Sequence, residues 1–168
     1  EAIDYIKDFA KSEIEISQRT IKEIHALVLH GINRENAGRY RQQNVLISGA
    51  TTTPPDYTLL NDKMAQLVDW YSNDAHKFHP IERAAKVHAD FVGIHPFIDG
   101  NGRTSRLLMN LELLKAGYPP CVITVENRLA YYEALDQWMA YGKTEAFIQL
   151  VSEAVLEGFK PYQVVLGI

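Results

Sequence analysis

The stretch HPFIDGNGRTSR, from His95 to Arg106, concentrates groups that could act on a phosphate. It holds an imidazole, a carboxylate, a glycine-rich turn and two guanidinium groups. Gly100 and Gly102 flank Asn101; glycine reaches positive φ without steric cost, and asparagine tolerates the left-handed region better than most residues. Such a turn can direct successive backbone N–H groups into one concavity, which favours a bound anion.

The residues around this turn suit the same ligand. A helical pattern runs from Arg103 to Ala116, and its N-terminus adds unpaired N–H groups and the positive end of the helix dipole. Arg103 and Arg106 share one face of the first turn, and arginine forks match phosphate oxygens in bidentate geometry. Asp99 could hold Mg²⁺ together with phosphate oxygens and waters. His95 ends the preceding helical pattern and can accept a proton near neutral pH.

Together these are the groups needed for attack of a hydroxyl on a nucleotide phosphate. Each alone has a structural alternative: a turn, a solvated helix face, a histidine at a helix end. Their conjunction within twelve positions favours the chemical interpretation. We therefore predict a catalytic base, a metal-binding carboxylate and a set of phosphate-binding residues: His95; Asp99; and Gly100, Asn101, Gly102, Arg103 and Arg106.

The same stretch is similar to the signature of the Fic family, HxFx(D/E)GNGRxxR, and meets every fixed position of it. Similarity continues outside the signature, in AGRYR (Ala37–Arg41), at Pro54–Pro55 and His79–Pro80, and in AGYPP (Ala116–Pro120). The resemblance implies a mainly α fold, a helical bundle with a small β-hairpin flap. It implies one domain over residues 1–168, with a core at about 15–158 and a flap at about 42–57.

The resemblance implies a protein adenylyltransferase, which moves AMP from ATP to a Ser, Thr or Tyr hydroxyl of a target protein and releases pyrophosphate, with Mg²⁺ as cofactor. It also implies that Tyr131 and Tyr132 help to form the adenine pocket, where an aromatic face can stack on a base. The exposed edge of the flap is expected to pair with an extended stretch of the target by strand addition. The residues of that edge are Val45, Leu46, Ile47, Ser48 and Gly49.

Other activities stay open. Fic relatives also transfer UMP or phosphocholine, some remove AMP, and a non-catalytic nucleotide- or peptide-binding module is a further alternative. The Doc branch, which phosphorylates, lacks the Gly-Asn-Gly turn that this chain keeps. Around Gln137–Ala140 the chain departs from an Ala-Asn pair of the animal members, so base selectivity is open. Self-AMPylation and a homodimer are also compatible with the resemblance.

Many Fic proteins carry an inhibitory helix, (S/T)xxxE(G/N), whose glutamate pairs with the second signature arginine. No such motif precedes Ala2, and Glu157 has Glu153 where the motif needs Ser or Thr. We therefore expect Glu157 to be an ordinary helix-end residue, with a braking role as the alternative. Arg106 should then be free to meet phosphate, and the chain should be constitutively active.

Composition narrows the class of protein. The 168 residues are 46% hydrophobic and suffice for one compact domain with a core. The net charge of −4 argues against non-specific nucleic-acid binding, which needs a basic surface. The single Cys121, in an apolar context, predicts a buried thiol and excludes a disulfide framework.

No stretch is apolar and long enough to span a membrane, and no signal peptide is visible. We expect a cytoplasmic bacterial protein; Glu1 in place of methionine suits a domain excised from a longer chain.

Hydrophobic spacing predicts the elements that position these residues. The helix that follows the signature is apolar around its whole circumference and should be buried centrally. The segment from Asn44 to Gly49 should form a short strand or hairpin arm. His25 and His30 are expected at the helix periphery, Arg39 and Arg41 in surface ion pairs, and Phe97 beneath the loop. A helix with Ser17 as its N-cap and Gly31 beyond its end is predicted, and further helices are predicted over Ala2–Lys11, Leu59–Ser72, Pro80–Ile94, Arg103–Ala116, Glu126–Tyr141 and Thr144–Glu157.

Overall fold

The computed structural model describes residues 2–12 and 15–167, and within these ranges the only regular secondary structure is helical. The predicted mainly α class is confirmed. The predicted β-hairpin is wrong, because residues 42–56 consist of turns and irregular backbone without a strand, and Tyr57 begins a short 3-10 helix. The elements in chain order are α1 (Ala2–Ala10), α2 (Gln18–Val28), η1 (Tyr57–Leu59), α3 (Leu60–Asn73), η2 (Ala75–Lys77), α4 (Pro80–Ile94), α5 (Asn101–Lys115), α6 (Arg128–Tyr141) and α7 (Glu145–Leu166).

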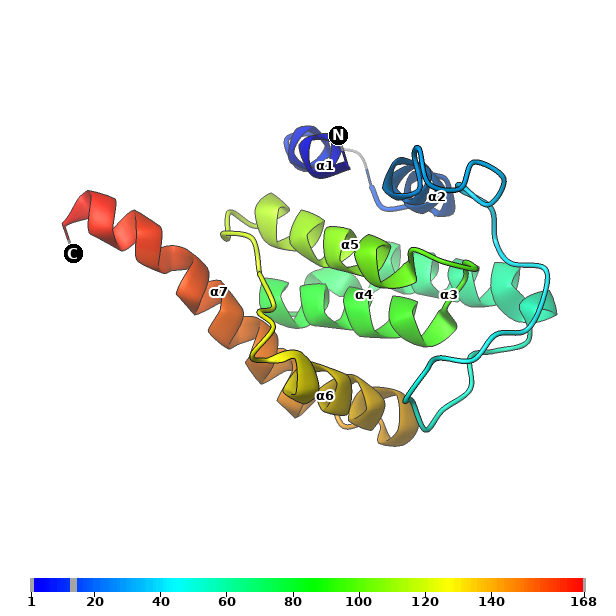
Figure 1. The fold of residues 1–168 in the computed structure, drawn as a ribbon. Helices are drawn as coiled ribbons and strands as arrows, with labels where there is room; N and C mark the ends of the chain where they lie inside the picture. The colour runs from blue at the N-terminus through cyan, green and yellow to red at the C-terminus, as the bar shows by residue number, and fades with distance from the viewer. Residues whose placement is uncertain (1, 13–14, 168) are drawn as a thin grey trace.

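Helices α4 and α5 lie side by side at the centre of the bundle (Figure 1). Helices α1 and α2 pack on α5, α3 packs on α4, and α6 and α7 pack on the other side of α4. The short loop between α4 and α5, residues 95–100, carries the first half of the signature. The candidate site is therefore built on the most enclosed pair of helices, which favours a rigid site.

The local sequence explains where these two helices begin and end. Helix α4 starts with His79 as N-cap and Pro80 in the first turn, and Glu82 completes a capping box with His79. It ends at His95, whose backbone is left-handed, with φ of 50°. Helix α5 starts after Gly100, which is also left-handed, with φ of 80°. The two left-handed residues reverse the chain within the six residues of the loop.

Two apolar clusters hold the bundle together. One lies between α4, α5, α6 and α7 and contains the fully buried Phe147. The other joins α1, α2, α3, α4 and α5 and contains Phe91 and Phe97, both fully buried. Phe97 belongs to the loop between α4 and α5, so its predicted role as an anchor beneath that loop is confirmed.

Helix α5 is central, as predicted, but its buried surface is not purely apolar. Asn101, Thr104, Ser105 and Glu112 are buried along it. The Glu112 carboxylate accepts hydrogen bonds from the Tyr71 hydroxyl on α3 (2.5 Å to Oε1) and from Arg83 Nε on α4 (2.7 Å to Oε2). A buried charge needs such partners, which the hydrophobic pattern of one helix does not reveal.

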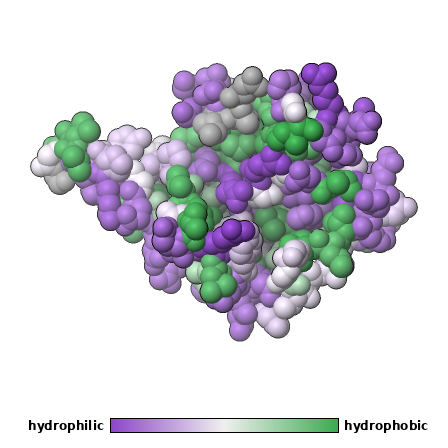
Figure 2. Space-filling model, viewed as in Figure 1, coloured by the Kyte–Doolittle hydropathy of each residue, from purple (hydrophilic) through white to green (hydrophobic). Residues whose placement is uncertain are grey.

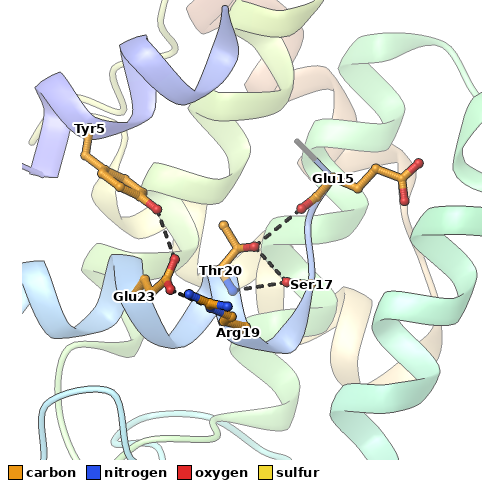
Figure 3. Close-up of polar contacts among 6 residues, drawn as sticks. All are labelled: Tyr5, Glu15, Ser17, Arg19, Thr20 and Glu23. Atoms are coloured by element: carbon orange, nitrogen blue, oxygen red, sulfur yellow. Dashed lines mark hydrogen bonds and ion pairs between the residues drawn. The ribbon is translucent and has the colours of Figure 1, made fainter. Parts of the chain in front are cut away.

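Polar contacts fix α2, which lies against the signature loop, to α1 (Figure 3). The Tyr5 hydroxyl on α1 donates to Glu23 Oε2 on α2 over 3.2 Å, and Arg19 Nε donates to Oε1 over 2.8 Å. Helix α2 begins as predicted, since Ser17 Oγ accepts from the Thr20 backbone N–H at 3.1 Å.

Helix α7 continues past Glu157, where the sequence pattern predicted its end. The next residue, Gly158, allows close packing against the segment before α6. A Cβ added at Gly158 would lie 3.2 Å from Pro119 side-chain atoms and from the Pro120 carbonyl oxygen. The helix then projects from the bundle and exposes apolar residues at its tip, including Val164 and Val165 (Figures 1 and 2). Among the described residues, no helix combines the length and apolar character needed to cross a bilayer.

Replacing Glu112 by alanine should destabilise the fold by about 3–5 kcal/mol, because it removes one partner of a buried ion pair. Urea unfolding measures the change. Glu23→Ala is the matched control, since Glu23 also accepts from a tyrosine and an arginine but lies at the surface, where the loss should be far smaller. Equal losses for the two variants would show that the buried pair does not hold α5 to α3 and α4.

Candidate functional site

A cavity of about 490 Å³ lies between the end of α4, the start of α5, helix α6 and the flap segment, residues 42–57. The structure thereby brings together groups predicted from distant parts of the sequence. The predicted site residues that line the cavity are His95, Gly102, Arg106, Tyr131, Tyr132, Ile47, Ser48 and Gly49. Arg106 also lines an apolar groove between α1, α2 and α5, together with Arg103.

The His95 imidazole has the geometry of a proton acceptor. Its Nδ1 lies 3.3 Å from the Val92 carbonyl oxygen, so Nδ1–H donates there and Nε2 keeps its lone pair. Burial lowers the pKa of His95; the bond to Val92 opposes this shift, and the charge of Arg41 adds to it. The ring is therefore neutral near pH 7. Among the described residues, His95 is the one non-glycine residue with positive φ, a conformation typical of functional sites under strain.

The turn before α5 offers backbone donors. The first bond of the helix runs from Thr104 N–H to the Gly100 carbonyl, at 2.9 Å, which leaves the N–H groups of Asn101, Gly102 and Arg103 without a partner inside the helix. The Asn101 side chain is buried. Its Oδ1 accepts from the Phe97 N–H at 3.0 Å, and its Nδ2 donates to the Phe97 carbonyl at 2.8 Å. Its side chain therefore shapes the loop, while its N–H lies at the helix N-terminus.

Asp99 lies at the rim of this turn, with its side chain 61% exposed. Its Oδ1 accepts from the Gly100 N–H at 2.6 Å, and its Oδ2 lies 3.2 Å from Arg103 Nη2. The described residues contain no group of three or more His, Cys, Asp or Glu side chains that could enclose a metal ion. One exposed carboxylate beside a phosphate-binding turn is nevertheless the donor set that Mg²⁺ uses when phosphates and waters supply the other ligands. Asp99 fits that role.

The prediction that His25 lies at the helix periphery is wrong. The residue is fully buried beneath the signature loop. Its ring stacks on Phe97 with 3.5 Å between centroids and 1° between planes. Its Nδ1 accepts from the Gly38 N–H at 2.9 Å, so Nε2 carries the proton and donates to the Asp99 carbonyl at 2.9 Å. The signal available in the sequence was its position one residue after Ile24 on the buried face of α2.

Arg41 is also placed differently from the prediction of a surface ion pair. It is buried and donates to three backbone carbonyls: Nε to His95 (2.9 Å), Nη1 to Gln43 (2.9 Å) and Nη2 to Pro55 (2.6 Å). Because Gln43 and Pro55 lie near opposite ends of the flap segment, Arg41 closes that segment and ties it to His95. The sequence alone gave no sign that its partners would be carbonyls instead of carboxylates.

Hydrogen bonds from side chains hold the flap segment together, whereas a β-hairpin would be held by backbone hydrogen bonds between its two strands. At its base, Asn44 Nδ2 donates to Asp56 Oδ2 at 2.8 Å. At its far end, the Thr51 backbone N–H and hydroxyl both donate to Asp136 on α6, over 2.8–3.0 Å. Pro54 and Pro55 have no N–H to donate to a ladder, which disfavours pairing of this arm. Val45 and Leu46 do not line the cavity, and Leu46 is 80% exposed.

The two adjacent tyrosines of α6 have different surroundings. Tyr131 is buried, and its hydroxyl lies 2.8 Å from His88 Nε2. Tyr132 is 52% exposed, with the Arg128 guanidinium 5.7 Å from the centre of its ring. Arg128 and Asp136 also line the cavity, and sequence reasoning missed both. Their spacing on α6 could have placed them on the same side as Tyr132, since residues four apart share a helix face.

Replacing His25 by phenylalanine should keep the stack on Phe97 but destabilise the fold by about 1–3 kcal/mol for each backbone group left unpaired. Burial lowers the pKa of His25, so the unfolded chain binds the proton more readily. The unfolding free energy of the wild type should therefore fall as pH decreases below the ordinary histidine value of 6.5.

Urea unfolding at about pH 7.5 and pH 5.5 tests this pH dependence. Between these two pH values, the unfolding free energy of His25→Phe should fall less than that of the wild type. His76→Asn, on the exposed side of η2, is the control and should behave as the wild type. An unchanged pH dependence in His25→Phe would contradict the assignment.

Comparison with known proteins places this geometry in a family. Residues 15–113 match the model of the Fic/DOC family. The chain is 43% identical over 155 residues to the protein adenylyltransferase Fic of Nematostella vectensis, covering 90% of this chain and 35% of that protein. It is 40% identical over 127 residues to the protein adenylyltransferase fic-1 of Caenorhabditis elegans, covering 75% of this chain and 25% of that protein. The chain thus spans about a quarter to a third of the length of these relatives.

Solved structures of Fic proteins have the same fold as this chain. A fragment of Fic-1 from C. elegans superposes with a TM-score of 0.85 at 33% identity, covering 99% of this chain and 50% of that one. A Fic-domain signalling protein from Bacteroides thetaiotaomicron gives 0.82 at 28% identity, covering 94% and 66%. The family match covers more than half of the chain and includes the whole signature. The chain belongs to the Fic/DOC family.

Proposed function

We propose that this chain is a protein adenylyltransferase, which transfers AMP from ATP to a Ser, Thr or Tyr hydroxyl of a target protein. The observation that carries the proposal is one cavity that holds both a neutral imidazole with a free ring nitrogen and a helix N-terminus with an arginine beside it. The names of the related proteins from N. vectensis and C. elegans support the same reaction.

The phosphates of ATP would lie over the N-terminus of α5, where the N–H groups of Gly102 and Arg103 and the helix dipole favour negative charge. Arg103 and Arg106 would hold the phosphate oxygens by charged hydrogen bonds. Such donors stabilise the charge that develops during transfer, because they are already oriented before the reaction. Among the described residues, Arg106 forms no ion pair with a carboxylate, so its charge is available to phosphate.

The transfer itself follows from the free nitrogen of His95. Its Nε2 accepts the proton of the target hydroxyl, and the hydroxyl oxygen forms a bond to the α-phosphorus. The bond from that phosphorus to the bridging oxygen breaks, and pyrophosphate leaves. Asp99 would hold Mg²⁺, which supplies positive charge to balance the polyphosphate when it is bound.

The flap and α6 would position the two substrates. The flap is tied to His95 through Arg41 and to α6 through the contact between Thr51 and Asp136. An extended segment of the target could add along Val45–Gly49, as exposed backbone in that stretch has no ladder partner. The exposed ring of Tyr132 offers a face for the adenine.

Replacing His95 by alanine should reduce AMP transfer by about 10²–10⁴-fold, the scale of a general base. The protein is mixed with Mg²⁺ and α-labelled ATP, and label on the chain or on proteins of an added lysate is measured. His30→Ala, on the exposed end of the turn after α2, is the control and should label as the wild type. Labelling by His95→Ala at the wild-type rate would remove His95 from the mechanism.

The acid limb of the pH profile of kcat/KM should have its midpoint below 6.5, because burial lowers the pKa of His95 in the folded protein. The base is active when neutral, so activity falls as pH decreases through that lowered pKa. Transfer rates measured from about pH 5 to 8 give the midpoint. A midpoint well above 6.5 would indicate that another group is the base.

A further inference from the structure

A second buried histidine, His88 on α4, lies behind the cavity and takes no part in the reaction described above. It is fully buried, and its ring stacks on Phe147 at 5.2 Å between centroids. Burial lowers the pKa of His88 to about 3, and the nearby charge of Arg106 acts in the same direction. The ring is therefore neutral at any pH at which the enzyme would work. Its Nε2 lies 2.8 Å from the Tyr131 hydroxyl.

Tyr131 stands between this neutral ring and a permanent cation. Burial raises the pKa of Tyr131 to about 12, and the charge of Arg106, which lines the same cavity, opposes that rise. Arginine has only donors, so a hydrogen bond between these two neighbours can run only from Arg106 to the Tyr131 oxygen. In that arrangement the single proton of the hydroxyl goes to His88 Nε2, 2.8 Å away. The proton of the neutral His88 ring then lies on Nδ1, which is buried and has no hydrogen-bond partner among the described residues.

The arrangement matters for Arg106 because few protein groups hold its guanidinium in place. A Cβ added at Gly102 would lie 3.9 Å from Arg106 Nη2, so the guanidinium lies beside the start of α5. Among the described residues, no carboxylate pairs with it. An arginine without a fixed partner loses considerable side-chain entropy when it binds a ligand. A neutral hydroxyl removes part of that cost and leaves the positive charge available, whereas a carboxylate would compete with the phosphate.

We propose that Tyr131 and His88 are positioning residues for nucleotide binding: the buried imidazole orients the Tyr131 hydroxyl, and that hydroxyl holds the Arg106 guanidinium beside the N-terminus of α5. The inference rests on the proposed function, in which Arg106 binds phosphate. It assigns Tyr131 a role through its hydroxyl, where the family resemblance suggested a role through its ring. The ring of Tyr132 remains the exposed aromatic face of the cavity.

Tyr131→Phe separates the two roles, because it keeps the ring and removes only the hydroxyl. The KM for ATP should rise about tenfold or more, the scale of one hydrogen bond to a charged group, while kcat should change less than threefold. In an Arg106→Ala background the same substitution should have little effect, since the two groups act as one unit. A stacking role would leave the KM of Tyr131→Phe unchanged, and a purely structural role would give equal effects in both backgrounds; either result would overturn the proposal.

The orienting role of His88 is tested by comparing a replacement that lacks a hydrogen-bond acceptor with one that keeps it. His88→Leu should reproduce the KM increase of Tyr131→Phe, and His88→Gln, which keeps an acceptor for the hydroxyl, should restore part of the loss. Thermal melting of each variant identifies those that fold, and the comparison is made on these. Equal KM values for the leucine and glutamine variants would contradict the orienting role of His88.

Tyr118→Phe is the matched control, because Tyr118 also pairs with a histidine, His79, at 3.4 Å but lies outside the cavity. Its KM for ATP should equal that of the wild type. Calorimetric titration with ATP, run on the same proteins, keeps this test independent of catalysis. A wild type that binds ATP but transfers no AMP would refute the proposed function, while weaker ATP binding by Tyr131→Phe would still support the positioning role.

Discussion

The packing of α4 against α5 is the constraint on which the site depends. The chain must reverse between two buried helices, and it does so with left-handed backbone at His95 and Gly100. Phe97 fills the space beneath this reversal, and His25 stacks on it from α2. The proton acceptor and the helix N-terminus are therefore held on opposite ends of one short loop. A site built this way needs little reorganisation before it reacts. Donors and dipoles that are oriented in advance are the main source of electrostatic catalysis in enzymes.

Three histidines around this loop are buried or half-buried, and burial lowers the pKa of each. Each is kept neutral, and the partners of its ring nitrogens fix which nitrogen carries the proton. His25 donates through Nε2 to a backbone carbonyl, and His95 donates through Nδ1 and leaves Nε2 free. Neutral rings suit this environment because Arg41, Arg103 and Arg106 already supply positive charge. A charged imidazole would add repulsion and lose its acceptor nitrogen.

The flap illustrates how irregular backbone can be held without a sheet. Its ends are joined by Arg41, and its far end is joined to α6 by Thr51 and Asp136. Side-chain bonds of this kind fix the ends of a segment but leave the backbone between them unpaired. In the proposed function that unpaired backbone, at Val45–Gly49, is what a target segment would meet.

Sequence by itself determined the helical class, the approximate bounds of most helices and the burial of Phe97, because hydrophobic period and capping residues are local signals. It also identified the signature from His95 to Arg106, since those residues are adjacent in the chain. Only the tertiary structure decided the partners of His25, Arg41 and His88, which lie far away in sequence. Whether a polar side chain faces water, a carboxylate or a buried carbonyl depends on which distant segment packs over it, and no local pattern contains that information.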